Sequence, residues 1–369
     1  MDVVKTAARL IRAESPSGGE APAARVLMEE AEALGFAPEL DEAGNVEFAI
    51  GEGEHEVLLT GHMDVVPAGD PGEWPRPPFG GEVVDGELWG RGAVDMKGAL
   101  AAMLAAMARL AAEPPAGRVR FLAVVQEEVG GLGSRFASER LQADAALLGE
   151  PSSLRLMRGH RGRIEVWADY EGRLAHAARP QLGHNPLPEL GRFLAALEAF
   201  ETAVHPDLGE ASCTPTFVGS EPRATNVVPG LAQVCIDYRF VPGEDPEAIL
   251  ERMRLIAGDA SVYIPETERS SGEVKMRYPL VFPPYLVEAD HPLVKTALQA
   301  LGQEEAGVWW FTTDAPYLAS SGAVVLGLGP GDPELAHTTR ERVATAELEA
   351  AALAYERVSR RLLEVLNGG

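Results

Sequence analysis

The fold of this chain is decided by residues 97–128, which read KGALAAMLAAMARLAAEPPAGRVRFLAVVQEE. Their first half is rich in alanine, leucine and methionine, which favour helices, so we predict a helix over 97–112. After a loop containing proline and glycine, residues 118–126 have the pattern of a buried strand that stops at Glu127 and Glu128. A helix that leads through a short loop into an apolar strand is the repeating unit of α/β proteins.

The same alternation continues on both sides of this unit. Further apolar strands are predicted at 57–60, 145–148 and 323–328, and further helices at 2–12, 20–34, 291–301 and 345–366. Strands that alternate with helices form a sheet that is covered on both faces. The sequence therefore predicts an α/β domain with a mostly parallel sheet and helices on both faces.

The pattern changes between about residues 159 and 287. Residues 159–170, GHRGRIEVWADY, alternate polar and apolar side chains as a half-exposed antiparallel strand does. Further strands are predicted near 213–219 and 231–240, helices at 186–203 and 245–257, and a proline-rich return linker at 278–285. We therefore predict two domains. Residues 1–158 and 288–369 form the α/β domain, and residues 159–287 form an inserted small α+β sandwich.

Composition excludes several classes of function. The chain has 32 lysines and arginines against 56 aspartates and glutamates, a formal net charge of −24. Such a surface repels phosphate backbones, so nucleic acid is not expected as a partner, and an acidic substrate needs a local basic pocket. No apolar stretch is long enough to span a membrane, and the first residues lack the apolar core of a signal peptide. Two cysteines, Cys213 and Cys235, fit a reducing compartment, so we predict a cytoplasmic protein.

Side chains that could hold metal ions follow the apolar strands. His62 and Asp64 come directly after the strand at 57–60, where the carboxylate can hold the imidazole in one tautomer. A structural histidine is the alternative. Glu127 and Glu128 are neighbours in an extended backbone and point in opposite directions, so one can bind metal while the other faces a reacting water. A solvated pair of loop glutamates is the alternative reading.

Three further motifs complete the candidate site. Asp95 lies in the glycine-rich GRGAVDMKG segment just before the strongest helix, where it is either a helix cap or a carboxylate that bridges two cations. Glu150 follows the strand at 145–148, and His337 lies in the PGDPELAH loop after the last apolar strand. Mixed histidine and carboxylate ligands suit zinc, and also cobalt or manganese. Two such ions lower the pKa of a bridging water, whose proton a nearby carboxylate can take.

The motifs also occur in a recognisable order. They are GHMDVVPAG, a segment with Trp74 and Pro78-Phe79-Gly80, GRGAVDMKG, EEVGGLGS, GEP and PGDPELAH. In this order the chain resembles the M20 metallopeptidase family over nearly its whole length. The family includes acetylornithine deacetylase, succinyl-diaminopimelate desuccinylase, aminoacylases and dipeptidases. The resemblance implies a zinc-exopeptidase-like catalytic domain and an inserted lid or dimerisation domain.

The resemblance also implies a role for each metal-site residue. His62 and Glu150 are expected to hold one ion, and Glu128 and His337 the other. Asp95 is expected to bridge the two. Glu127 is the expected general base and acid, and Asp64 is expected to orient His62. The ions are expected to be zinc, with cobalt or manganese as alternatives.

Other matching residues fall in or near the inserted domain. His176, in GRLAHAARP, resembles a histidine that dimeric members send into the partner's active site, although Leu174 stands where serine or glycine is usual. By the same resemblance, the expected substrate-binding residues are Asn226 in TNVVPG, Arg239 in IDYRF, Arg161 in GHRGR and Thr313 in TTDA. Arg163 belongs to the same basic GHRGR stretch, and solvated strand residues are the alternative for it and Arg161. A homodimer through the inserted domain is implied.

These observations together predict an enzyme. We expect a metal-dependent amidohydrolase that removes an acyl group from an N-acyl amino acid with a metal-activated water. A dipeptidase or carboxypeptidase of the same family is the alternative. A non-catalytic relative would lack a ligand or the base, and the sequence lacks neither. A nucleotide-binding enzyme is disfavoured because GRGAVDMKG lacks the fingerprint spacing and puts Asp95 where a phosphate would lie.

Overall fold

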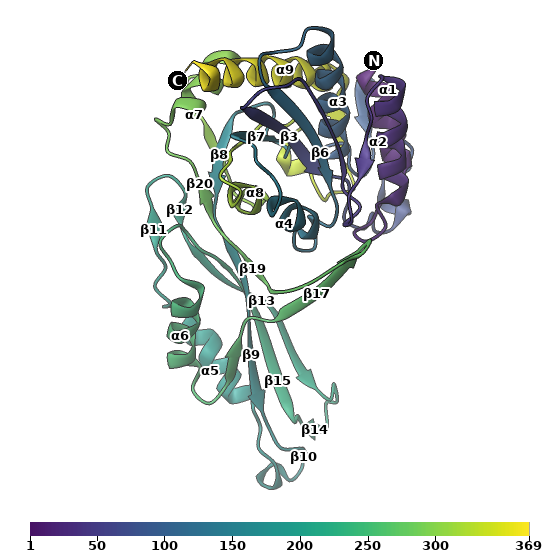
Figure 1. Ribbon diagram of the computed structural model, residues 1–369. Helices are drawn as coiled ribbons and strands as arrows, with labels where there is room; N and C mark the ends of the chain where they lie inside the picture. Colours follow the sequence, from purple (N-terminus) through teal and green to yellow (C-terminus); the bar gives the residue numbers. More distant parts are fainter. Residues whose placement is uncertain (369) are drawn as a thin grey trace.

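A nine-stranded sheet forms the centre of the larger domain in the computed structural model, which describes residues 1–368 (Figure 1). Its four central strands run parallel in the order β6 (Arg118–Val124), β3 (Glu56–His62), β7 (Ala145–Leu148) and β22 (Val324–Gly327). Antiparallel pairs flank them: β2 (Val46–Ile50) and β1 (Glu39–Leu40) on one side, β8 (Met157–His160) and β20 (Tyr285–Leu286) on the other. The short strand β21 (Gly307–Trp309) runs parallel to β8. The prediction of parallel strands thus holds for the centre, whereas the edges are antiparallel because short turns rather than helical crossovers connect some of them.

Helices cover both faces of this sheet, as the alternating side chains of its strands require. On β3, Val57 and Leu59 belong to one hydrophobic core and Leu58 to the other. The first core is covered by α1 (Val3–Arg12), α2 (Ala21–Ala33), α3 (Lys97–Ala112), α7 (Pro292–Leu301) and α9 (Thr345–Asn367), and the second by α4 (Leu132–Ser138) and α8 (Ala315–Ala319). The helix predicted at 97–112 is α3, and it is buried along most of its length.

A second sheet, entirely antiparallel, lies below the first in Figure 1. Its strands are β13 (Ser212–Glu221), β15 (Leu231–Arg239), β9 (Arg163–Glu171), β16 (Ser261–Tyr263) and β19 (Val281–Phe282). Buried and half-buried residues alternate along β9, and its buried face packs on α5 (Leu187–Leu197) and α6 (Pro246–Ala257). The helix expected to reach residue 203 ends at Leu197, because the chain then turns into the small ladder of β11 (Val204–His205) and β12 (Gly209–Glu210).

The chain passes from one sheet to the other at two places. The first lies between β8 and β9, at residues 160–163, and the second between β19 and β20, at residues 282–285. Three smaller pieces complete the architecture. They are the sheet of β4 (Glu82–Val84), β5 (Glu87–Trp89) and β23 (Arg342–Ala344), the pair β10 (Ala175–His176) and β14 (Val227–Val228), and the hairpin of β17 (Glu266–Ser271) and β18 (Val274–Pro279). Among residues 1–368, no helix has the length and apolar character needed to cross a membrane.

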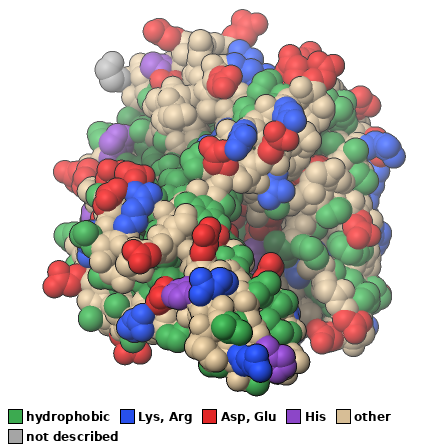
Figure 2. All heavy atoms as spheres, turned by 90° about the horizontal axis from the view of Figure 1, so that it is seen from below, with side chains coloured by type: hydrophobic (Ala, Val, Ile, Leu, Met, Phe, Trp, Pro, Cys, Tyr) green, Lys and Arg blue, Asp and Glu red, His purple; other side chains and the backbone are tan. Residues whose placement is uncertain are grey.

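The end of the inserted domain that carries β10 and β14 lies farthest from the larger sheet (Figure 1). Figure 2 views this end directly and shows histidine and basic (lysine or arginine) side chains among hydrophobic and neutral ones. Arg173, His176, Arg179 and His184 lie in this region, which includes β10, and the side chains of Arg173, His176 and Arg179 are exposed. Acidic side chains are prominent elsewhere on the same view.

Candidate metal centre

The parallel strands bring the predicted ligands to one edge of the sheet. His62 is the last residue of β3, Glu127 and Glu128 follow β6, Glu150 follows β7, and the loop after β22 carries His337. Because these four strands are neighbours and run parallel, their carboxyl ends lie together. Asp95 reaches the same place from the turn that precedes α3.

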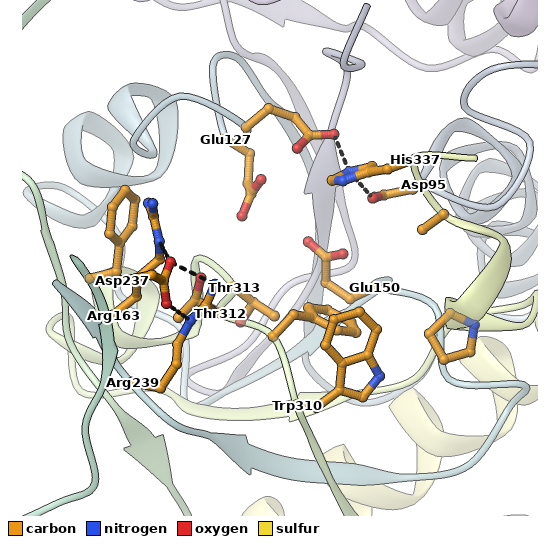
Figure 3. Close-up of a pocket in the computed structure, with 15 residues that line it drawn as sticks. Asp95, Glu127, Glu150, Arg163, Asp237, Arg239, Trp310, Thr312, Thr313 and His337 are labelled. Atoms are coloured by element: carbon orange, nitrogen blue, oxygen red, sulfur yellow. Dashed lines mark hydrogen bonds and ion pairs between the residues drawn. The ribbon is translucent and has the colours of Figure 1, made fainter. Parts of the chain in front are cut away.

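Interatomic distances define two groups that share one carboxylate, and Figure 3 shows the contacts of His337, which belongs to one of the groups. Asp95 Oδ1 lies 2.9 Å from His62 Nε2, and Asp95 Oδ2 lies 3.1 Å from His337 Nε2. Glu150 Oε1 lies 3.8 Å from His62 Nε2, and Glu128 Oε1 lies 3.1 Å from His337 Nε2. In each group of three residues, the potential ligand atoms lie within 4.8 Å of one another.

The buried carboxylates of this cluster are stabilised by added positive charge. Burial raises the pKa of Glu128, and it raises the pKa of Glu150 well above its usual range. Hydrogen bonds to Asp95 and Glu128 raise the pKa of His337 to about 10. Carboxylates packed this closely in a buried site need protons or cations to compensate their charge. Two imidazoles and three carboxylates are also the donor set that zinc prefers, so the residues fit a pair of divalent cations.

Asp64 acts on two parts of the site. His62 Nδ1 donates to the backbone carbonyl of Asp64 at 2.8 Å, which orients the ring so that Nε2, the nitrogen that could bind a metal ion, faces Asp95. The carboxylate of Asp64 is 3.6 Å from the same Nδ1. It accepts hydrogen bonds from the amides of Glu127 and Glu128 at 3.0 and 3.2 Å. Asp64 therefore orients His62 chiefly through its backbone, and its side chain holds the turn that carries both glutamates. The prediction of an extended backbone at Glu127 and Glu128 was wrong, because β6 ends at Val124 and the chain turns after it.

The turn that carries Asp95 depends on a residue that the sequence did not reveal. Glu341 is fully buried, and its Oε1 accepts the amides of Gly92, Val94 and Asp95 at 2.9, 3.0 and 3.1 Å. Its other oxygen accepts from Arg91 Nη1 at 2.5 Å. Because nearly 250 residues separate these partners, no local motif could have signalled the contact.

Glu127 lies beside the two groups without belonging to either. Its side chain lines the same cleft as Asp95, Glu128 and Glu150. Burial, together with the nearby charges of Asp314 and Glu150, raises the pKa of Glu127 well above its usual range. A carboxylate with a raised pKa, next to a place where water can bind, is suited to accept and return a proton.

The cleft has a volume of about 320 Å³ and a basic group at the end opposite His337 (Figure 3). Asp237 accepts from Arg163 Nε at 2.6 Å and from Arg239 Nε at 2.6 Å. Two guanidinium groups thus share one carboxylate that lines the cleft, and Arg163 Nη2 also pairs with Glu165 at 3.3 Å. Thr313 also lines the cleft, and Phe282, Trp310 and Phe311 supply aromatic surface. Arg163 and Arg239 are thus basic groups that line the cleft of this acidic protein.

Three predicted residues lie outside the cleft of their own chain. Arg161 lies in the connection between the sheets, and its Nη1 donates to the carbonyl of Glu210 at 2.6 Å. His176 and Asn226 lie on the paired segments β10 and β14 or beside them, near the far end of the inserted domain (Figure 1), where the amide of Ala177 donates to the backbone carbonyl of Asn226 at 2.9 Å. His176 Nδ1 accepts the amide of Ala178 at 3.0 Å. That bond leaves Nε2 of the exposed imidazole as its donor.

Comparison with known proteins places this chain in a family. The model of peptidase family M20/M25/M40 matches residues 58–361. The chain belongs to this family. It is therefore a hydrolase of amide bonds. The chain is also 34% identical to the succinyl-diaminopimelate desuccinylase of Caulobacter vibrioides, in an alignment that covers 98% of this chain and 96% of that enzyme.

Solved structures share the fold at lower sequence identity. The metallo-carboxypeptidase Sso-CP2 of Sulfolobus solfataricus, also of the M20 family, superimposes with a TM-score of 0.81 and 18% identity, over 99% of this chain and 100% of the other. The YXEP protein of Bacillus subtilis, a dinuclear metal binding peptidase of the M20 family, gives a TM-score of 0.72 and 16% identity, over 98% of both chains. The α/β domain with an inserted domain is thus the fold of this family.

Proposed function

We propose that the chain is a two-metal amidohydrolase that removes the acyl group from an N-acyl amino acid. The observation that carries this proposal is a single cleft with two distinct ends. At one end, Asp95 is shared by two groups of metal-ligating residues, with Glu127 beside them. At the other end, Arg163 and Arg239 present positive charge. The 34% identity to a desuccinylase supports the same class of substrate.

We assign the ligands as two sets. His62 and Glu150 would hold one ion, Glu128 and His337 would hold the other, and Asp95 would be a ligand of both. Zinc suits this donor set best, with cobalt or manganese as alternatives. When bound, the two cations acidify a water molecule and polarise the amide carbonyl.

The protein's own groups carry the proton and hold the substrate. Glu127 takes a proton from the water whose oxygen adds to the amide carbon. It then gives that proton to the nitrogen as the C–N bond breaks, which releases the amine and a carboxylic acid that ionises to a carboxylate. Arg239 and Arg163 hold a carboxylate of the substrate, since guanidinium groups recognise carboxylates with defined geometry. Thr313 lines the wall of the cleft on the substrate side.

A panel of substrates tests this assignment against the alternative. The panel contains N-acetyl and N-succinyl amino acids, dipeptides and peptides with a free C-terminal carboxylate, each assayed with added zinc or cobalt. Turnover of the N-acyl amino acids with the highest kcat/KM is the expected result. Faster cleavage of dipeptides, or release of C-terminal residues from longer peptides, would assign the chain to the dipeptidases or carboxypeptidases of the family instead.

We further propose that residues 159–287 form a lid and dimerisation domain in a cytoplasmic homodimer. Edge strand β13 exposes Phe217 and Val218, which are 41% and 51% accessible. Such exposed apolar residues on an open sheet edge favour pairing with another strand. A dimer would also explain why His176 and Asn226 lie away from the cleft of their own chain, because each could then serve the partner's cleft.

Replacing His176 by alanine is expected to lower kcat by about 100- to 1000-fold while both metal ions stay bound, since His176 donates a hydrogen bond to the developing oxyanion. Metal analysis and steady-state kinetics measure this.

Mixing the His176→Ala and Glu127→Ala chains tests whether His176 acts in the partner's site. Half of randomly reassembled dimers contain one intact site, so about a quarter of wild-type activity should return. No recovery in demonstrably mixed dimers would mean that His176 does not serve the partner's site.

A further inference from the structure

The hairpin of residues 266–279, which we call the strap, leaves the inserted domain and reaches back to the larger domain (Figure 1). Its two faces differ in exposure. Along β18, Val274, Met276 and Tyr278 are half-buried or buried, while Lys275 and Arg277 are exposed. Val274 and Met276 pack against the hydrophobic core of the larger domain. The strap is therefore an amphipathic arm that is anchored on the domain that holds the metal ligands.

The tip of the strap makes specific polar contacts there. Ser271 Oγ donates to the carbonyl of Ala43 at 2.6 Å, and the amide of Glu273 donates to the carbonyl of Glu42 at 2.8 Å. Gly272 has a φ of +54°, and a Cβ at this position would lie 2.2 Å from the Glu42 carbonyl oxygen. The tip of the strap thus packs so closely against Glu42 that position 272 has room for glycine but not for a side chain.

Gln126, the residue before Glu127, links the strap to the turn that carries the glutamates. Its Nε2 donates to the carbonyl of Ser270 at 2.7 Å. Its backbone has a φ of +55°, which is uncommon for a residue other than glycine. Its amide donates to Glu20 at 3.1 Å, and its carbonyl accepts from Gly131 at 2.8 Å. Such a backbone conformation persists only where surrounding contacts stabilise it, and the hydrogen bond to Ser270 of the strap is one of these contacts.

Tyr278 holds the other end of the same turn. A Cβ on Gly130 would lie 2.7 Å from the hydroxyl oxygen of Tyr278, so the ring lies directly against this glycine. Arg135 stacks between the rings of Tyr278 and Tyr317, at 4.2 and 3.9 Å from their centroids. It also donates to the carbonyl of Gly130 at 3.0 Å. Residues 126–131 are therefore fixed at both ends by contacts that involve the strap.

We propose that the strap positions Glu127, and that Gln126 and Tyr278 are positioning residues for the proton transfer. This rests on the proposed function, in which Glu127 carries the proton. The argument is geometric: Glu127 must hold its carboxylate within hydrogen-bond reach of the water and of the leaving nitrogen. A displacement of about 1 Å in such a group can lower the rate by about 100-fold. The position of the Glu127 carboxylate therefore depends on the contacts that the strap makes with the larger domain.

Two variants from opposite sides of the contact test this, with a third as control. Gln126→Asn keeps a residue that tolerates positive φ, but the side chain is one carbon too short to reach Ser270. Gly272→Ala pushes the tip away from Glu42 without touching Gln126. Lys275→Ala changes the exposed face of the strap, where Lys275 pairs only with Glu268, and should behave as wild type.

Both test variants are expected to lower kcat by about 10- to 100-fold with little change in KM and with two metal ions bound. The double variant should be no slower than the slower single variant, because both changes break one linkage. Hydrogen exchange at the amides of residues 126–131 should be faster in both, a readout that needs no substrate.

Unchanged kcat and unchanged exchange in either variant would overturn the proposal. So would two effects that multiply in the double variant, or a rise in KM at constant kcat. These outcomes differ from failure of the proposed function, in which wild type and Lys275→Ala are both inactive on every amide of the panel. In that case faster exchange at residues 126–131 would still support the structural linkage, and unchanged exchange would contradict it.

Discussion

Replacing Glu127 by alanine is expected to abolish turnover, a fall in kcat of about 10⁴-fold, which is the upper end of what a general acid–base group contributes. The reason is that Glu127 lies in the cleft beside both ligand groups but belongs to neither of them. No other described residue of the cleft is both a carboxylate free of the ligand groups and close to the place where the water would bind. Asp237, the remaining acid there, is already engaged by Arg163 and Arg239.

Metal analysis decides whether this loss has the proposed cause. The Glu127→Ala protein should keep two ions per chain, because the amides of residues 127 and 128 still bond to Asp64. The matched control is Glu128→Ala, a change of the same size at the next residue, which would remove a proposed ligand of one ion. Loss of one ion from the Glu127 variant, with retention of both in the Glu128 variant, would mean that the two roles are exchanged.

Much of the larger domain was predictable because its signals are local. The helix at 97–112 follows from its composition, and the strands at 57–60, 118–126 and 145–148 follow from short apolar runs that end in polar residues. Because the carboxyl ends of neighbouring parallel strands meet, His62, Glu128 and Glu150 could be expected near one another without any knowledge of distances. The structure brings these three together with Asp95 and His337.

The supporting contacts were not predictable because they join residues far apart in the chain. Glu341 holds the Asp95 turn from about 246 positions away, and Ser270 meets Gln126 from 144 positions away. Each is an ordinary polar residue in its local sequence. Only the folded chain shows that the amides around Asp95 and the carboxamide of Gln126 need these partners.

The two arginines of GHRGR illustrate a second limit. They are two residues apart, and the sequence offered no reason to separate them. In the structure Arg161 lies in the connection before β9 and turns to the carbonyl of Glu210, whereas Arg163 begins β9 and turns to Asp237 on the neighbouring strand. Which of the two faces the cleft is decided by where the strand begins, and periodicity alone places a strand boundary only to within a few residues.

The change with the widest consequence for metal binding is Asp95→Asn. Asparagine keeps the shape of the side chain but removes its charge and one of its two acceptor oxygens. Since Asp95 belongs to both groups of ligating residues, each ion loses a ligand at once. We expect both ions to be lost on dialysis, because even groups that only support the ligands contribute about 10- to 100-fold to affinity. Activity should fall below detection.

Glu150→Gln is the matched comparison, since Glu150 belongs to one group only. That variant should keep one ion, bound by Asp95, Glu128 and His337. Calorimetric titration of zinc into both ion-free proteins distinguishes the two patterns. Asp95→Asn should weaken zinc binding at two sites, and Glu150→Gln should weaken it at one. Two tightly bound ions and normal turnover in Asp95→Asn would disprove the shared carboxylate. Equal loss of both ions in the Glu150 variant would instead mean that the two sites cannot fill independently, so that the second ion binds only once the first has drawn the carboxylates together.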